Sequence, residues 1–310
     1  MTTTPTLRSS LADYLAVRRS LGYKLERAGL LLGQFVSFCE LAGSTRVTRE
    51  LALAWVCQPS EASPSWLDMR LSAVRGFATW LQASDPATEV PDRDWLPPRH
   101  RPTPFVYTDT EVEALIAVAS RARWPLSAAT YDTLIGLLSV TGMRIGEAIR
   151  LDRADLALDE GLLTIRNSKF GKSRQLMVHP TTVAALRTYL HRRAALSPTP
   201  GEPALFVHPA GNRINYVPVC AMFHALVRRA GVEPRAAGGK PTIHGLRHTF
   251  AVNSLIRWYR DGLDVGARLP VLSTWMGHVE PKGTYWYLSA VPELLSLAAE
   301  RLEVAAETLS

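Results

Sequence analysis

A proline-rich stretch divides this chain and limits what it can fold into. Residues 83–107, ASDPATEVPDRDWLPPRHRPTPFVY, contain six prolines and several arginines. Proline removes a helical hydrogen bond and clashes with the preceding turn, so we expect no helix to continue through this segment. The sequence on both sides has helical periodicity. We therefore expect a domain at residues 1–85, a stiff basic linker at residues 86–107 and a second domain at residues 108–310.

The first domain is predicted to be a small four-helix domain. SLADYLAVRRSLG, LERAGLLLGQFVSFCELAG, VTRELALAWVC and residues 65–81 each place apolar residues at the spacing of one helical face. Ser10 is expected to cap the first helix and Gly22 to end it. Basic residues mostly fall outside the apolar stripes and should point outward, either as a solvated face or as a binding surface. They include Arg18, Arg19, Lys24, Arg27, Arg70 and Arg75.

The second domain is predicted to be mainly helical with a small antiparallel sheet. A capping signal at Thr108 opens one helix, and YDTLIGLLSVTGMRIGEAIRL is typical of a buried helix, a Thr-Gly break and a second helix. Residues 161–179 contain two strand-like runs around a polar turn with Gly171, which indicates a hairpin. Helical patterns resume at Pro180. The fold class is therefore α+β, with α-helix predominating.

The charge of the chain favours a polyanionic partner. A net charge of +7 and a pI near 9.5 would attract DNA or RNA along much of the approach path. Cys39, Cys57 and Cys220 show no spacing typical of a disulfide framework or a zinc site, which fits a reducing cytoplasm. The longest apolar runs, such as Leu134 to Val140, are too short to span a membrane. We expect no metal and no membrane attachment.

Two short motifs could bind a phosphate. In TGMRIGEAIRL, Arg144 and Glu147 lie three residues apart after the Gly break, although such pairs are usually surface salt bridges. In TIHGLRHTFA, His244 and Arg247 share a helical face and could both donate to one phosphate, for which a guanidinium is well shaped. His248, one step further on, is expected to point elsewhere. Each motif alone is weak evidence.

A third motif follows near the end of the chain. In WMGHVEPKGTYWYL, His278 precedes Tyr287 by nine residues, and Tyr285 lies two residues before Tyr287. In chain order the sequence therefore has Arg-x-x-Glu, a hairpin lysine, His-x-x-Arg, Gly-His and a tyrosine. This ordered set resembles the tyrosine recombinases of the phage integrase family, of the Xer and transposase kind. The resemblance covers the whole second domain, and the helical first domain is similar to the family's core-binding domain, which is SAM-like.

The resemblance implies a fold and a set of site residues. The two domains would form a C-shaped clamp around DNA. Tyr287 would be the nucleophile, Glu147 would support the first arginine, and Tyr285 would serve in packing or DNA contact. Lys172 lies in the same turn as Lys169 and is the alternative for the hairpin lysine, although the alignment of RQLMVHP favours Lys169. The implied catalytic residues are Arg144, Lys169, His244, Arg247, His278 and Tyr287.

The resemblance also implies a reaction and its partners. Such an enzyme cleaves and rejoins double-stranded DNA through a 3′-phosphotyrosine intermediate and a Holliday junction, with no ATP, metal ion or other cofactor. It would act as a homotetramer on paired sites, alone or beside related recombinases, in the cytoplasm at the nucleoid. Integration or transposition of a mobile element is the expected task.

Three other functions remain compatible with parts of the sequence. A type IB topoisomerase uses similar chemistry as a monomer, although the short helical first domain and the spacing of His278 and Tyr287 favour a recombinase. A DNA-binding accessory protein could keep the fold without activity, and an RNA-binding helical protein would leave the ordered motifs unexplained. The final stripe of Leu294, Leu295, Ala298 and Leu302 could dock on a neighbouring protomer or pack on its own domain.

Overall fold

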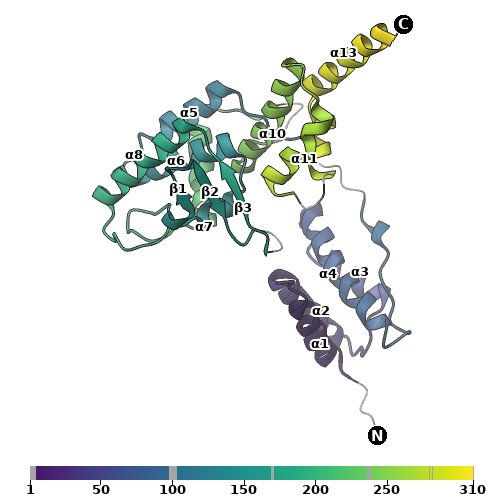
Figure 1. The fold of residues 1–310 in the computed structure, drawn as a ribbon. Helices are drawn as coiled ribbons and strands as arrows, with labels where there is room; N and C mark the ends of the chain where they lie inside the picture. The colour runs from purple at the N-terminus through teal and green to yellow at the C-terminus, as the bar shows by residue number, and fades with distance from the viewer. Residues whose placement is uncertain are drawn as a thin grey trace. The chain divides into compact units, whose positions relative to one another are not determined.

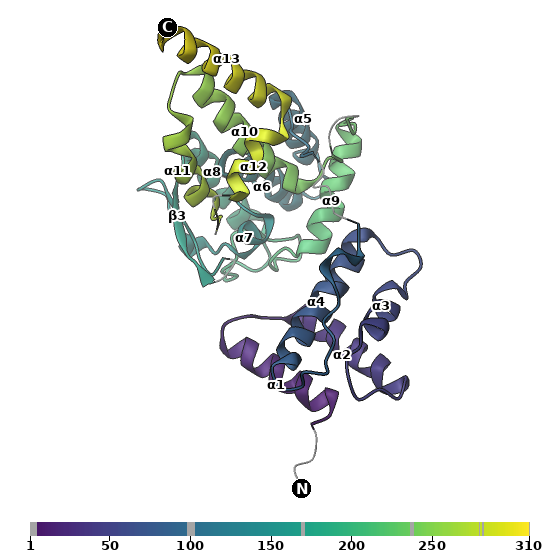
Figure 2. The same ribbon diagram turned by 90° about the vertical axis from the view of Figure 1, so that its right-hand side faces the viewer.

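The computed structural model describes residues 5–97, 103–168, 171–235, 239–278, 280 and 282–309, without the side chains of residues 289, 290 and 302–309. The chain forms two compact units, residues 1–101 and 102–310 (Figures 1 and 2). Each unit has its own buried hydrophobic core. The units are therefore described one at a time.

The first unit contains the four predicted helices. They are α1 (Leu7–Ser20), α2 (Glu26–Leu41), α3 (Arg49–Cys57) and α4 (Pro64–Gln82), followed by a short 3-10 helix, η1 (Arg93–Trp95). Phe35 and Val36 of α2, Trp55 of α3 and Val74 and Phe77 of α4 are buried together at the centre. The helical periodicity of the sequence thus identified both the helices and their inner faces.

The start of α1 differs from the prediction. Ser10 is buried inside the helix, and the cap is Thr6, whose hydroxyl accepts a hydrogen bond from the Ser9 N–H. Thr6 is the cap because the apolar stripe already begins at Leu7, so the first turn starts earlier than Ser10. The predicted end was right, since Gly22 directly follows the C-cap residue and has a positive φ.

Two arginines of α4 were predicted to point outward, but they do not. Arg70 is buried, donates to the Trp55 carbonyl and lies with its guanidinium 3.6 Å from the centre of the Trp55 ring. Burial lowers its pKa below the usual arginine value. Arg75 donates to the Pro91 carbonyl. A long side chain can lie along the helix and replace water with a carbonyl and an aromatic face, which a helical stripe pattern does not show.

The proline-rich stretch is not an isolated linker along its whole length. Val90, Trp95 and Leu96 pack against the core of the first unit. Phe105 and Tyr107 are buried in the core of the second unit, where the Tyr107 hydroxyl donates to the Thr242 carbonyl at 2.9 Å. Both ends of the segment are therefore fastened to the units that they join.

The second unit is helical around a small sheet. Its helices before the sheet are α5 (Asp109–Ala119), α6 (Pro125–Thr141), α7 (Ile145–Arg150) and the 3-10 helix η2 (Arg153–Asp155). The strands are β1 (Leu156–Ala157), β2 (Leu162–Ile165) and β3 (Arg174–Met177). The helices after the sheet are α8 (Pro180–Leu196), α9 (Tyr216–Arg229), α10 (Ile243–Arg260), α11 (Val265–Met276), α12 (Lys282–Ala290) and α13 (Pro292–Leu309). This arrangement confirms the predicted α+β class.

The sheet is antiparallel with strand order β1-β2-β3. The predicted hairpin is present, with Leu162 opposite Met177 and Ile165 opposite Arg174. The third strand, β1, was not predicted, because a two-residue strand is too short to show alternation. Leu163 and Leu176 face the core from adjacent strands.

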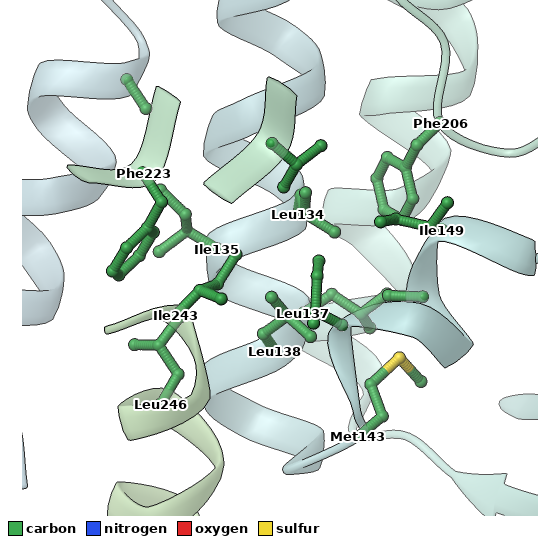
Figure 3. Close-up of a cluster of buried hydrophobic side chains, with 14 of the residues drawn as sticks. Leu134, Ile135, Leu137, Leu138, Met143, Ile149, Phe206, Phe223, Ile243 and Leu246 are labelled. Carbon is green, nitrogen blue, oxygen red and sulfur yellow. The ribbon is translucent and has the colours of Figure 1, made fainter. Parts of the chain in front are cut away.

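Helix α6 forms the centre of the second unit. Its residues Leu134, Ile135, Leu137 and Leu138 are buried, with side chains of neighbouring helices and loops packed around them (Figure 3). A helix that is apolar on nearly every side has to be enclosed by other elements. This central position matters for the site, because the C-terminal end of α6 leads directly to Arg144.

The last helix packs on its own unit through its first turns. Leu294 is buried beside α10, whereas Leu295 is exposed, since adjacent residues on a helix point about 100° apart. Arg301 donates to the carbonyls of Gly262 and Leu263. Leu294 and Leu295 therefore do not belong to one buried stripe, and the side chain of Leu302 lies outside the described residues.

The turn after α6 generates a stability prediction. Gly142 ends α6 with φ of +60°, and a Cβ added there would lie 2.4 Å from Cδ1 of Phe250. Gly142→Ala should therefore destabilise the protein by about 2–4 kcal/mol, measured by urea unfolding, through backbone strain and overpacking. Gly231→Ala is the matched control. Gly231 has φ of +67°, but no neighbouring atom lies within 4 Å of an added Cβ, so the free energy of unfolding should fall by only about 1 kcal/mol. Equal losses in both variants would contradict the Phe250 contact.

Candidate active site

Arg144 is fixed by the start of α7. It is the N-cap residue, and its N–H donates to Oε2 of Glu147 at 2.9 Å. Its Nη1 donates to Oε1 of Glu147, and its Nη2 donates to the Gly277 carbonyl, both at 2.9 Å. The side chain keeps 27% of its surface exposed. The predicted pairing of Arg144 with Glu147 is therefore present, and the guanidinium is held in place while still accessible from solvent.

A second arginine, which was not predicted from the sequence, binds the same carboxylate. Arg174, at the start of β3, donates from Nη1 to Oε1 of Glu147 at 3.1 Å and from Nη2 to Oε2 at 2.8 Å. Its Nε donates to the Trp275 carbonyl at 2.8 Å. Arg174 shares the inward face of β3 with the buried Leu176. A charged residue at an inward strand position was the signal that could have identified it.

Glu147 is ionised although it is buried. Glu147 is only 3% exposed, and burial alone would raise the pKa of its carboxyl group. The hydrogen bond and charge of Arg174, together with those of Arg144, outweigh burial and lower the pKa to about 2. A bidentate guanidinium pair of this kind is among the stronger charge-assisted interactions in proteins.

Arg247 is buried on α10 and bound to two backbone carbonyls. Its Nη1 donates to the Gly142 carbonyl at 2.7 Å, and its Nη2 donates to the Met276 carbonyl at 2.8 Å. These carbonyls stand at the C-terminal ends of α6 and α11, where helix dipoles favour positive charge. Burial, followed by the charge of Arg144, lowers its pKa to about 10, so Arg247 remains positive at neutral pH.

His278 and Tyr287 lie next to each other at the end of α11 and on α12. Nδ1 of His278 lies 2.7 Å from the Thr284 hydroxyl, and its ring is 6.5 Å from the ring of Tyr287 and nearly parallel to it. Tyr287 is 2% exposed, whereas Tyr285 is 51% exposed. The two tyrosines thus occupy different faces of α12, as expected from their spacing.

His248 was predicted to point away from the site, but it lies within it. Its Nδ1 lies 3.0 Å from the Tyr287 hydroxyl. Its ring also contacts Trp286, and it meets the ring of His244 edge to face at 4.7 Å between centroids. Residues four apart on a helix share one face, so His244 and His248 lie one above the other on α10. That spacing was available in the sequence and should have grouped His248 with the site.

The structure brings most of the predicted site residues together. Arg144 and Glu147 are joined by hydrogen bonds. Arg247 lies close enough to Arg144 for the charge of Arg144 to lower its pKa. The ring of His278 lies nearly parallel to the ring of Tyr287. His244 is exposed at the start of α10. Lys169 lies outside the described residues. Lys172 is described and exposed, and its carbonyl accepts from the Ser168 N–H.

Neither a metal centre nor a membrane span is found in the described part of the chain. Within those residues no group of three or more histidine, cysteine, aspartate or glutamate side chains could hold a metal ion. Among the described helices, none has the length and apolarity needed to cross a bilayer.

Comparisons with known proteins define the class. Residues 106–293 match the phage integrase family. The chain is 41% identical over 305 residues to the putative integrase/recombinase y4rB of Sinorhizobium fredii, covering 96% of this chain and 97% of that protein. It is 29% identical over 238 residues to tyrosine recombinase XerD of Caulobacter vibrioides, covering 76% of this chain and 73% of that protein.

Solved structures show the same fold. The Tn1549 transposon integrase, in complex with transposon right end DNA, matches with a TM-score of 0.69 and 19% identity, covering 97% of this chain and all of that chain. The XerH recombinase in a post-cleavage complex with its difH substrate matches with a TM-score of 0.65 and 18% identity, covering 97% of this chain and 86% of that chain. Fold and family match together define a tyrosine recombinase. The chain belongs to the phage integrase family and is a site-specific recombinase.

The buried Glu147 generates a pH prediction. A carboxyl whose pKa falls from 4.5 to about 2 on folding stabilises the protein above pH 4.5, and this stabilisation is lost as the pH falls toward 2. Over that range the wild type should lose about 3 kcal/mol more unfolding free energy than Glu147→Gln, measured by urea titration at several pH values. Glu293→Gln breaks only an exposed pair with Arg260 and should change stability by less than about 1 kcal/mol. Parallel pH curves for wild type and Glu147→Gln would contradict the assignment.

Proposed function

We propose that the protein breaks and rejoins DNA strands through Tyr287, forming a 3′-phosphotyrosine intermediate and exchanging strands through a Holliday junction. The observation that carries this proposal is the grouping of Arg144 and Arg247 with Tyr287, contributed by three separate segments of the second unit. Family membership supports it. Arg144, Arg247, His244, His278, Lys169 and Tyr287 are the proposed catalytic residues.

Arg144 and Arg247 form a cationic cluster that would stabilise the negative charge that develops during cleavage. Attack on a phosphodiester builds negative charge on the nonbridging oxygens, and donors already in position stabilise it without rearranging. Arg144 is partly exposed and oriented by Glu147, which would let its guanidinium meet a phosphate. Arg247 would add its buried charge, and the exposed His244 would be a third donor. Loss of one such donor typically costs on the order of 10²–10³ in rate.

Proton transfer completes the proposed reaction. A phenol is a weak nucleophile at neutral pH until it loses its proton. The departing 5′ oxygen leaves readily only when protonated. Lys169, which comes between β2 and β3 in the sequence, is the proposed acid, with Lys172 as the alternative. His278, whose Nδ1 contacts the Thr284 hydroxyl, would help to hold or discharge charge near the cleaved bond. The 5′ hydroxyl can then attack the phosphotyrosine in reverse, which conserves the bond energy without ATP or a metal cofactor.

Double-stranded DNA is the proposed partner. The net charge of +7 favours a polyanion, and the Tn1549 and XerH structures are complexes with DNA. The two units would close around the duplex as a clamp. Exchange of two duplexes requires four cleavages, so a homotetramer on paired sites is proposed, alone or with related recombinases. Such an enzyme would act on cellular DNA in the cytoplasm, at the nucleoid.

A mobile element is the proposed setting. One curated relative is a putative integrase/recombinase, and one structural neighbour is a transposon integrase. Integration or transposition of such an element is therefore the proposed task.

The nucleophile can be tested by trapping the intermediate. Wild-type protein incubated with DNA carrying the sequences that flank its own gene should form a covalent adduct on a denaturing gel, and Tyr287→Phe should abolish the adduct while leaving DNA binding intact. Tyr285→Phe is the matched control and should retain it. Loss of the adduct in Tyr285→Phe with retention in Tyr287→Phe would overturn the assignment, and relaxation of plasmids without such sites would favour a type IB topoisomerase.

DNA binding should weaken steeply with salt. Each phosphate neutralised by lysine or arginine releases counterions, so log K should fall with log salt at a slope of about −0.9 per contact. A clamp that makes six or more contacts should lose on the order of 10³-fold in affinity between 50 and 200 mM salt, measured by fluorescence anisotropy. A slope near zero would contradict the clamp.

A further inference from the structure

The side chain of Tyr287 is enclosed by its own unit, which leaves almost no room for a phosphate beside its hydroxyl. The residue is 2% exposed and packs in the cluster formed by α10, α11, α12 and α13 with Val252, Leu255, Met276 and Leu294. In-line attack requires the reacting atoms to come within about 3–3.5 Å of each other. A DNA backbone cannot enter a hydrophobic core. As the proposed nucleophile, Tyr287 would have to move before it could react, so this arrangement would be a resting one.

A hydrogen bond with α10 helps to hold the hydroxyl in this position. Nδ1 of His248 lies 3.0 Å from the Tyr287 oxygen. The rings of Trp286 and Tyr287 also pack against the His248 ring, at 5.6 and 5.5 Å between centroids. Aromatic packing would be kept by any similar ring, but the polar contact requires an atom that can donate or accept at the position of Nδ1.

The same imidazole touches a residue that the substrate would meet. His244 is exposed, lies one turn before His248 on α10 and meets its ring edge to face at 4.7 Å. Arg247 lies between them in sequence and has its guanidinium in the cationic cluster. A phosphate that engages His244 would therefore act on a ring in direct contact with the one that holds the nucleophile.

We propose that His248 is a positioning residue that keeps the Tyr287 hydroxyl in this resting place and releases it when a DNA phosphate engages His244. The inference rests on the proposed role of Tyr287 as the nucleophile. It assigns to His248 a restraint on the start of cleavage rather than a part in the chemical step. Loss of one ordinary hydrogen bond should raise the released population about fivefold.

Two variants separate the hydrogen bond from the packing. His248→Phe keeps a ring of similar size but has no polar atom, and His248→Asn places an amide close to the position of Nδ1. Each is nitrated with tetranitromethane in the absence of DNA, and mass spectrometry of the peptide of residues 283–301 gives the nitration of Tyr287 relative to Tyr285. Tyr285 is 51% exposed on the same helix and serves as the internal reference.

The resting role predicts different results for the two variants. The ratio of Tyr287 to Tyr285 nitration should rise about fivefold in His248→Phe and stay within about twofold of wild type in His248→Asn. Thermal unfolding checks that both variants fold. An unchanged ratio in a folded His248→Phe variant, or an equal rise in both variants, would overturn the proposal.

Adduct formation with DNA provides the second measurement. If His248 restrains the nucleophile, His248→Phe should form the covalent adduct about fivefold faster than wild type, and His248→Asn should match wild type. A loss of adduct formation in either variant would place His248 in the chemical step and overturn the resting role. An adduct that persists in Tyr287→Phe would instead overturn the proposed function, while the nitration ratio would still report whether His248 holds Tyr287.

Discussion

The carboxylate of Glu147, buried between two guanidinium groups, is the interaction on which the arrangement of the site depends. It fixes Arg144 at the start of α7 and Arg174 at the start of β3, and Arg174 in turn binds the last turn of α11 through the Trp275 carbonyl. A buried carboxylate with one partner removed would be an uncompensated charge, at a cost of several kcal/mol. The Glu147 carboxylate therefore holds α7, β3 and the segment leading to His278 in fixed positions relative to one another.

The same cluster is short of negative charge. Arg144, Arg174 and Arg247 carry three positive charges and Glu147 supplies one negative charge, so the group has a local excess of two. Carbonyls at the ends of α6 and α11 compensate Arg247 only partly, because they carry fractional charge. The fold tolerates this excess because the backbone positions are set elsewhere, by α6 and its surrounding core. In the proposed reaction, a phosphate that approached Arg144 would supply the missing negative charge to donors that need not rearrange.

The sequence predicted the elements well and the contacts between them unevenly. Helical stripes, the hairpin and the Arg144–Glu147 pair depend on local spacing, which can be read along the chain. Arg174 was missed because its partner is 27 residues away, on a different element. The burial of Arg70 depends on the Trp55 ring and carbonyl of another helix. His248 was a different kind of failure, since its four-residue spacing from His244 was visible, but its contact with Tyr287 arises only when α12 packs on α10.

Packing of α12 on α10 also explains why two neighbouring tyrosines have such different surroundings. On a helix, residues two apart point to nearly opposite sides, so a core contact for Tyr287 leaves Tyr285 in solvent. An exposed phenol beside a permanently positive cluster would be free to attack any phosphate that reached it. If Tyr287 acts as proposed, its burial against His248 would make attack depend on a movement of Tyr287, and contacts with DNA would have to supply the energy for that movement. The packing that encloses the proposed nucleophile would thereby contribute to the choice of DNA site.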